Sequence, residues 1–312
     1  MRAEAAAAFA AFALAGLFVV GDAAAFCRTT TVAVPPDHNP VDGCFLQGVP
    51  LYHPSSCLPY RLQNKESAKL PNAQISDKLA RAFAAWTAPN PVCTPGIAAI
   101  ELAPVDDELI ANYVQGQRGH NIVGVPATWP HTGGGETLAL ATLTFNADSG
   151  EIYDVDLEIN PNPAWSFTET PPAEGFDLES ALTHEVGHML GFAHTEKPDA
   201  TMFASYTPGT TTIRDLDRDD QDAICWVYPS RTQRLGNTGL IPATPCNLAQ
   251  GSPGTNGCGD PEITHGCTIG QAMPSNDSSA MIGAAALALL GLSRLRRSVK
   301  TQSQVRSRSD AR

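Results

Sequence analysis

The spacing of hydrophobic residues changes along the chain, and these changes predict its elements. Apolar residues alternate with polar ones, or form short runs, in five stretches that we expect to be strands. Two of them, 137–145 and 151–159, flank the turn sequence Asn146–Gly150, so we expect a β-hairpin there. The other three predicted strands are residues 58–62, 99–103 and 121–125.

Helical spacing marks three further stretches. The first is 75–86, with Ser76 or Asn72 near its start, and the last runs from about Asp217 to Val227. The middle helix begins at Asp177, a residue type that caps helix N-termini, and Glu179 in its first turn suits the helix dipole. Its apolar stripe is Leu182, Val186, Met189 and Leu190. Because the predicted strands come before the middle helix, we expect an α+β fold, a mixed sheet with helices against it.

Opposite this stripe the middle helix carries a group of residues with the chemistry of a metal site. His184 and His188 are four residues apart, so both imidazoles leave the same face of the helix. Gly191 is expected to end the helix, because glycine adopts left-handed backbone without penalty. The chain can then double back and present His194 as a third ligand. Three histidines with an open fourth position are the donor set of a catalytic zinc ion.

Glu185 stands beside this pair of histidines, where a carboxylate can take a proton from water activated by the metal. A solvated helix with incidental histidines is the alternative interpretation. Five fixed positions of this kind would recur by accident in about one chain in 10^5 of this length. The sequence therefore predicts a catalytic zinc site.

The extended motif resembles that of the metzincin zinc peptidases, in which His-Glu-x-x-His-x-x-Gly-x-x-His precedes a Met-turn. Thr201-Met202-Phe203 is similar to this turn, whose methionine forms an apolar floor beneath the histidines; alone, Met202 would be interpreted as a core residue. Within the metzincins the chain is most similar to the matrixins. Further segments that carry the likeness are 138–141, 150–156, Thr195, 202–206, 217–224 and 228–229.

The resemblance spans residues 58–229 and implies a zincin fold, with a twisted mixed sheet, an active-site helix and a C-terminal helix. It implies that the strand around Leu138 and Ala139 pairs with an extended peptide substrate beside the metal. Tyr206 would line the pocket next to the cut, or would instead be a packing residue. The chain departs from animal matrixins at Leu140, where many have a histidine that binds a structural zinc, so that site is not carried over. No counterpart of their propeptide cysteine is evident; Cys44 is a remote candidate that a disulfide explains better.

Outside the peptidase segment, the organisation is that of an exported protein. Residues 1–25 are interpreted as a signal peptide, with an apolar stretch from Phe9 and small residues before Phe26. Residues 26–57 form a cysteine-containing N-terminal segment. Residues 230–280 are rich in Cys, Gly and Pro and show no helical or alternating pattern, so we expect a tether stapled by local disulfides. Residues 281–312 consist of an apolar run followed by arginines. Together with the preceding Gly266-Cys267, they resemble the C-terminal sorting tails of myxobacterial exported proteins. The alternative is a plain membrane anchor.

Export would place the eight cysteines in an oxidising compartment, where disulfides are expected, although their pairing is left open. The chain has a net charge of −12, and residues 26–280 contain 29 acidic and 12 basic residues. This acidic body argues against nucleic-acid binding, which needs a basic face. Matrixins bind calcium, and acidic residues around Asp154, Asp156 and Glu158 could hold it here. Acidic residues on a strand more often form the solvent-exposed face of that strand, so no calcium ligands are assigned.

The function predicted from the sequence is that of a secreted or surface-attached zinc endopeptidase, acting on proteins or peptides as a monomer. Zn²⁺ is held by His184, His188 and His194, and Glu185 is the general base. Two alternatives share this metal site: a zinc-bound surface or adhesion module without catalysis, and a zinc amidase that acts on cell-wall peptides.

Overall fold

A computed structural model of the chain describes residues 26–65, 67, 69–106, 121–131, 137–246, 261–271 and 305–307, the last two ranges as backbone only. The predicted signal peptide, the apolar run at 281–292 and most of the basic tail lie outside these residues. Within the described part, no helix has both the length and the apolar character needed to cross a membrane.

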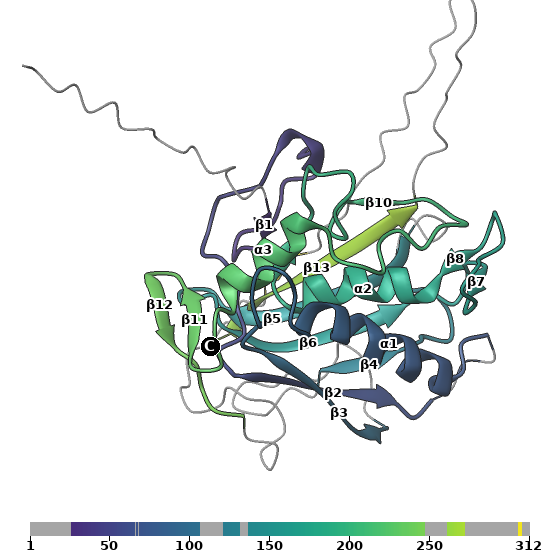
Figure 1. Ribbon diagram of the computed structural model, residues 1–312, viewed down its shortest axis with the longest axis horizontal. Coiled ribbons are helices and arrows are strands. Elements are labelled where there is room, and N and C mark those ends of the chain that lie inside the picture. Colours follow the sequence, from purple (N-terminus) through teal and green to yellow (C-terminus); the bar gives the residue numbers. More distant parts are fainter. Residues whose placement is uncertain are drawn as a thin grey trace, which may run out of the picture.

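The fold is built on a mixed sheet with strand order β10-β13-β5-β6-β4-β2-β3 (Figure 1). A further strand, β14, pairs with β13. Strands β3, β2, β4 and β6 run parallel to one another, whereas β5 runs antiparallel to both β6 and β13. The strands are β2 (Cys57–Gln63), β3 (Ala98–Val105), β4 (Ile122–Gly124), β5 (Thr137–Asn146), β6 (Ile152–Ile159), β10 (Ser205–Tyr206), β13 (Pro261–Gln271) and β14 (Val305–Ser307). The predicted α+β class with a mixed sheet is confirmed.

The predicted hairpin is formed by β5 and β6. Its turn is closed by Asn146, whose side-chain oxygen accepts hydrogen bonds from the N–H groups of Asp148 and Ser149 at 2.8 and 2.9 Å. The alternation of apolar and polar residues in both strands sets the register, in which Leu143 lies opposite Val155.

Two helices, α1 (Asn72–Thr87) and α2 (Leu178–Met189), lie side by side against one face of the sheet (Figure 1). Helix α1 begins at Asn72, the earlier of the two expected starts, while Ser76 lies inside it and donates to Glu101. Trp86 joins the two helices, since its indole N–H donates to the carbonyl oxygen of Thr183 at 2.8 Å. The sheet and both helices share one apolar core, to which α3 (Arg218–Val227) also contributes.

Four short strands form two small accessory pairs around α2. Strand β1 (Cys27–Arg28) pairs with β9 (Phe192–Ala193), and β7 (Trp165–Ser166) pairs with β8 (Phe176–Asp177). The N-terminal segment, which also contains a short 3₁₀ helix at Pro40–Asp42, therefore packs against the residues that follow α2.

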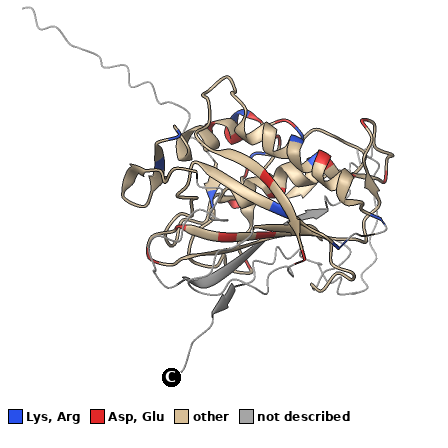
Figure 2. Cartoon of the chain, turned by 90° about the horizontal axis from the view of Figure 1, so that it is seen from below, with Lys and Arg blue, Asp and Glu red and all other residues tan. Residues whose placement is uncertain are grey.

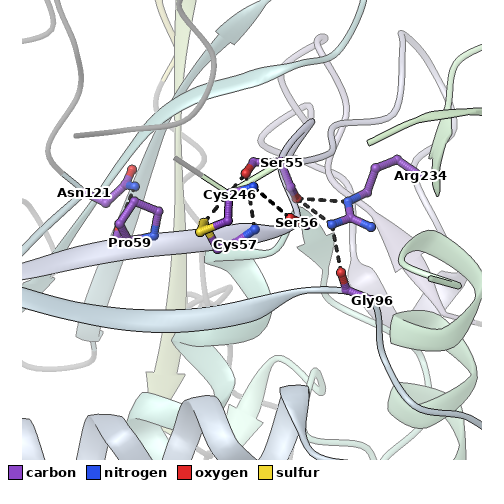
Figure 3. The surroundings of a disulfide bond; sticks show 8 residues. All are labelled: Ser55, Ser56, Cys57, Pro59, Gly96, Asn121, Arg234 and Cys246. Atoms are coloured by element: carbon purple, nitrogen blue, oxygen red, sulfur yellow. Dashed lines mark hydrogen bonds between the residues drawn. A yellow bond between two sulfur atoms is a disulfide. The ribbon is translucent and has the colours of Figure 1, made fainter. Parts of the chain in front are cut away.

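The expectation of a patternless tether after residue 229 is wrong for residues 233–242. They form a hairpin of β11 (Gln233–Gly236) and β12 (Gly239–Pro242). Arg234 is fully buried there and donates to the carbonyl oxygens of Ser55 and Gly96 (Figure 3). Four carbonyl groups and the ring of Tyr228 surround this guanidinium, and these contacts are not visible as a hydrophobic period in the sequence.

Six cysteines form the pairs Cys27–Cys44, Cys57–Cys246 and Cys93–Cys225, which confirms the disulfide assignment of Cys44. The expectation of local disulfides in the tether is wrong for Cys246, whose partner lies 189 residues away (Figure 3). This long-range bond fixes the chain beyond β12 to the start of β2. Of the remaining two cysteines, Cys258 lies outside the described residues, and Cys267 is described by its backbone alone, opposite Ala141.

Acidic residues occur on strands of the main sheet as well as on helices (Figure 2). Asp154, Asp156 and Glu158 of β6 are all buried, so the interpretation of these acids as a solvated face is wrong. Asp154 and Asp156 accept backbone N–H groups of Asn121 and Ile122, at 3.1 and 2.8 Å. These carboxylates therefore join β4 to β6.

Candidate metal centre

Helix α2 is positioned at its N-terminus by a capping carboxylate, as predicted. The side chain of Asp177 accepts the N–H of Ser180 at 2.8 Å. Arg214 holds the same carboxylate from the other side, with nitrogen–oxygen distances of 2.7 and 2.8 Å. All residues of the helix except Glu179 are buried, so it is not the amphipathic helix that its apolar stripe predicted.

Two carbonyl groups at the C-terminal end of α2 receive hydrogen bonds from distant side chains. His53 Nε2 lies 2.7 Å from the carbonyl oxygen of Met189, and Tyr228 donates its hydroxyl to that of Leu190, also at 2.7 Å. The same Tyr228 oxygen accepts the N–H of His53 at 3.1 Å. The last carbonyl groups of a helix lack partners within it, so these two residues stabilise the end from which the metal-site loop departs.

Gly191 ends the helix as predicted, with φ of +90°. A Cβ atom at this position would also lie 2.9 Å from the carbonyl oxygen of Leu51, so both the backbone angle and the available space favour glycine. The reversal leads into β9 and brings His194 back toward α2. Strand β1 covers the reversed segment, and the N–H of Thr29 donates to the carbonyl of Gly191 at 2.9 Å.

The structure brings together the three histidines that the sequence predicted. The Nε2 atoms of His184 and His188 are 3.0 Å apart, and that of His194 lies 3.2 Å from each. A tetrahedral zinc ion with bonds of about 2.0–2.1 Å places its ligand atoms about 3.3 Å apart. Among the residues that the structure describes, this is the group of histidine, cysteine and acidic side chains whose ligand atoms converge in this way.

The tautomers of two histidines are set by backbone carbonyl groups. His184 Nδ1 lies 2.6 Å from the carbonyl oxygen of Thr201, and His188 Nδ1 lies 2.8 Å from that of Phe192. A carbonyl oxygen only accepts, so each Nδ1 carries the proton and each Nε2 presents a lone pair. Two lone pairs 3.0 Å apart repel one another unless a cation lies between them.

Burial keeps these imidazoles neutral, as metal ligands must be. It lowers the pKa of His188 to about 4. The pKa of His184 falls well below its usual range, first because of burial and then because of the two neighbouring imidazoles. The two helical histidines are therefore neutral nitrogen donors, and together with the converging Nε2 atom of His194 they form a set of three nitrogen ligands that fits Zn²⁺.

Glu185 is fully buried and lies in the same helical turn as His184. The predicted Met-turn residue, Met202, is also buried and packs against α2 at Gly187. A Cβ atom at Gly187 would collide with the sulfur atom of Met202 and would lie 2.7 Å from the Trp86 ring. Glycine at position 187 is therefore what allows the methionine to approach the helix backbone.

The three residues predicted to contact substrate lie at the β5 and β10 side of the centre. Leu138 and Tyr206 belong to a small apolar cluster with Phe176 and Ile213, and Ala139 is buried in β5. The Tyr206 hydroxyl donates to the carbonyl oxygen of Thr210 and accepts the N–H of Asp177 at 3.2 Å. Tyr206 thus packs against the N-terminal end of α2, and its contact with substrate stays a prediction.

Two aspartates of α3 support the centre, and the sequence analysis gave them no role. Asp220 accepts the N–H groups of Thr201 and Met202 at 2.7 and 3.2 Å, so it holds the Met-turn. Asp219 accepts the hydroxyl of Thr195, the residue after the third histidine, at 3.1 Å. The available signal was the capping box at the start of α3, formed by Asp217 and Asp220.

The sheet, the active-site helix and the three converging histidines define the catalytic domain of a metzincin. The chain belongs to the matrixin family, a family of zinc-dependent metalloendopeptidases: the matrixin model matches residues 52–229. This match includes the metal centre, the Met-turn and α3.

Three relatives illustrate the likeness. The chain is 29% identical to interstitial collagenase A of Mus musculus over 178 residues, which are 57% of this chain and 34% of that protein. It is 27% identical to neutrophil collagenase of Homo sapiens over 190 residues, 61% of this chain and 36% of the relative. It is 30% identical to metalloendoproteinase 4-MMP of Arabidopsis thaliana over 115 residues, which are 37% of this chain and 32% of that protein. The chain thus spans about a third of the length of the relatives it matches.

Proposed function

We propose that this protein is an exported zinc endopeptidase that hydrolyses peptide bonds in proteins or peptides. The observation that carries the proposal is the convergence of the Nε2 atoms of three imidazoles to within 3.2 Å, beside a buried glutamate of α2. Three nitrogen ligands leave one position of a tetrahedral ion for water or substrate, which is the arrangement of a catalytic rather than a structural zinc site.

In this proposal His184, His188 and His194 hold the zinc ion. When bound, zinc lowers the pKa of water and polarises the carbonyl group of the substrate. Glu185 takes a proton from the attacking water, whose oxygen bonds to the peptide carbon. As the carbon–nitrogen bond breaks, the same carboxyl group returns the proton to the leaving amine. Burial of Glu185 keeps this proton away from bulk solvent.

The peptide substrate is proposed to bind as an extended strand along β5, with Leu138 and Ala139 next to the metal and Tyr206 beside the bond that is cut. An edge of a sheet binds extended peptides through backbone hydrogen bonds, and specificity then comes from pockets for alternate side chains. The protein is proposed to act as a monomer.

Residues 1–25 are proposed to be a signal peptide that directs export. Three disulfides support export, because disulfides form in oxidising compartments. The predicted domain boundaries remain proposals, except that the hairpin at 233–242 and Cys246 are part of the folded domain. Residues 281–312 are proposed to attach the protein to a membrane or cell surface. A calcium site remains a proposal without assigned ligands, since Asp154 and Asp156 accept backbone N–H groups.

The test is digestion of casein and of a broad peptide library by the purified full chain, with and without a chelator. We expect internal peptide bonds to be cut, and zinc to restore activity after chelation. The substitution Glu185→Ala should lower kcat/KM by about 10^2–10^4-fold, while metal analysis still finds one zinc ion per chain.

Glu174→Ala is the matched control, because Glu174 is exposed on a loop. It should retain full activity. Full activity of Glu185→Ala would refute the assigned base. Stoichiometric zinc without any cleavage would favour the non-catalytic module, and products from cell-wall peptides alone would favour the amidase.

A further inference from the structure

Strand β13 lies along the edge of β5 that the hairpin partner β6 leaves open (Figure 1). It pairs antiparallel with β5 over almost its whole length, from Pro261 opposite Asn146 to Gly270 opposite Thr137. The strands β2 to β6 come from residues 57–159, whereas β13 comes from a segment about 100 residues further along the chain. The edge of β5 is thus filled by a strand from outside the family match, which ends at residue 229.

The end of β13 lies between two strands. Gly270 and Gln271 pair in parallel with Ser205 and Tyr206 of β10, while the preceding residues pair with β5. The register with β5 shifts between Ile269 and Gly270, where the strand passes beside both neighbours. The segment therefore occupies a slot with an antiparallel wall on one side and a parallel wall on the other.

This slot adjoins the metal centre. Helix α2, which carries His184 and His188, contacts both β5 and β13. Strand β10 begins three residues after Met202 of the Met-turn. Ile269 lies opposite Ala139, one of the residues proposed to pair with an extended peptide. The segment thus has the location and the extended conformation that the proposed function assigns to a substrate.

We propose that residues 261–271 occupy the peptide-binding edge of the chain's own metal centre as a substrate-like strand, and so compete with other peptides. The effect of this strand on catalysis rests on the proposed function, whereas the occupancy of the β5 edge by residues 261–271 does not. An edge strand offers unpaired N–H and C=O groups, and a segment of the same chain can pair with them as well as a separate peptide can.

The disulfide Cys57–Cys246 makes this competition effective. It fixes the start of the linker 247–260 to β2, so 14 residues connect an anchored point to β13. Extended, such a linker spans at most about 50 Å. Short tethers of this kind produce effective concentrations of the order of 1 mM. A segment with an intrinsic dissociation constant of about 0.1 mM would then fill the groove about 90% of the time.

The direct test is hydrogen–deuterium exchange of the full chain carrying Ile263→Pro and Thr268→Pro. The N–H groups of successive residues in a strand point to opposite edges of that strand. One proline at an odd position and one at an even position therefore remove at least one N–H group that donates to β5. We expect exchange at the β5 amides that face β13 to rise by about 10-fold, while β6 amides keep their protection. The matched control is Thr255→Pro with Asn256→Pro in the linker, which should leave β5 protected.

Peptide hydrolysis by the same variants tests the competition. The apparent KM should fall by about 10-fold in the β13 variant and kcat should not change, because an occupant of the groove acts as a competitive inhibitor. Unchanged β5 exchange would overturn the occupancy, and faster exchange with an unchanged KM would overturn the competition. Absence of hydrolysis in every variant would count against the proposed function, and the exchange data would still decide the occupancy.

Discussion

His184 and Thr201 are joined by a hydrogen bond of 2.6 Å from the imidazole Nδ1 to the carbonyl oxygen. Thr201 is the residue before Met202, so one of the three converging histidines and the segment around Met202 hold each other in place. The N–H of Thr201 in turn donates to Asp220 of α3 at 2.7 Å. The orientation of this imidazole thus depends on a carboxylate that touches no metal ligand directly.

The first prediction concerns Asp220→Asn. Asp220 Oδ2 accepts two N–H groups, from Thr201 and Asp217, and Oδ1 accepts that of Met202. An asparagine has one acceptor oxygen, so its NH₂ group would face one of these N–H donors. We expect the free energy of unfolding to fall by about 1–3 kcal/mol and zinc affinity to fall by about 10–100-fold, measured by thermal unfolding and by competition with a chelator.

Asp222→Asn is the control for this change. Asp222 lies on the same helix but forms an ion pair on its surface with Arg218, at 3.0 Å. Surface pairs contribute about 0–1 kcal/mol, so stability and zinc affinity should both be close to wild type. Equal effects of the two substitutions would argue against the role of Asp220 in the Met-turn.

The second prediction concerns Gly187→Ala. The added methyl group would collide with Met202 and lie 2.7 Å from Trp86. Overpacking of this kind costs about 1–3 kcal/mol, which thermal unfolding measures. If Met202 is the main obstacle, Gly187→Ala combined with Met202→Ala should be less destabilised than the two single effects added together. Additive losses would show that Met202 and Gly187 are not coupled.

The strands, the helices and the convergence of the three histidines could be predicted from the sequence because the evidence for them is local. Hydrophobic period, turn residues and the spacing of His184, His188 and His194 all lie within short windows. The predicted hairpin at 137–159 and the start of α3 at Asp217 are confirmed for this reason. Gly191 was predictable because a helix end needs a residue that tolerates positive φ.

The interactions that were missed depend on residues far apart in the chain. Arg234 is buried because Ser55 and Gly96 supply carbonyl groups, and Cys246 pairs with a residue of β2. Helix α2 is buried all round because α1, the strands β5 and β6 and the short strands β8 and β9 all contact it, so its apolar stripe indicated only one of its buried faces. No period in the sequence encodes such contacts.

The third prediction concerns metal removal. Without a cation, the Nε2 lone pairs of His184 and His188, 3.0 Å apart, repel one another. A ligand that binds only the folded state stabilises it by about 2.7 kcal/mol at 100 times its dissociation constant. Zinc should therefore raise the Tm of the chelator-treated chain. His194→Ala should largely lose this shift, whereas His38→Ala in the N-terminal segment should retain it. An equal zinc response in both variants would contradict the assignment of His194.

The fourth prediction concerns acid stability. Burial lowers the pKa of His53 from 6.5 to about 4. The unfolded chain therefore binds this proton before the folded chain does, and stability present above pH about 6.5 is lost as the pH falls toward 4. For this residue alone the loss between pH 7 and pH 5 is about 2 kcal/mol. His53→Gln retains an N–H donor for the carbonyl of Met189 but does not titrate. In chelator-treated protein, the free energy of unfolding is measured by urea denaturation. Between pH 7 and pH 5, the value for the wild type should fall relative to that for this variant. A constant difference would mean that the pKa of His53 is the same in the folded and the unfolded chain, so that burial does not lower it.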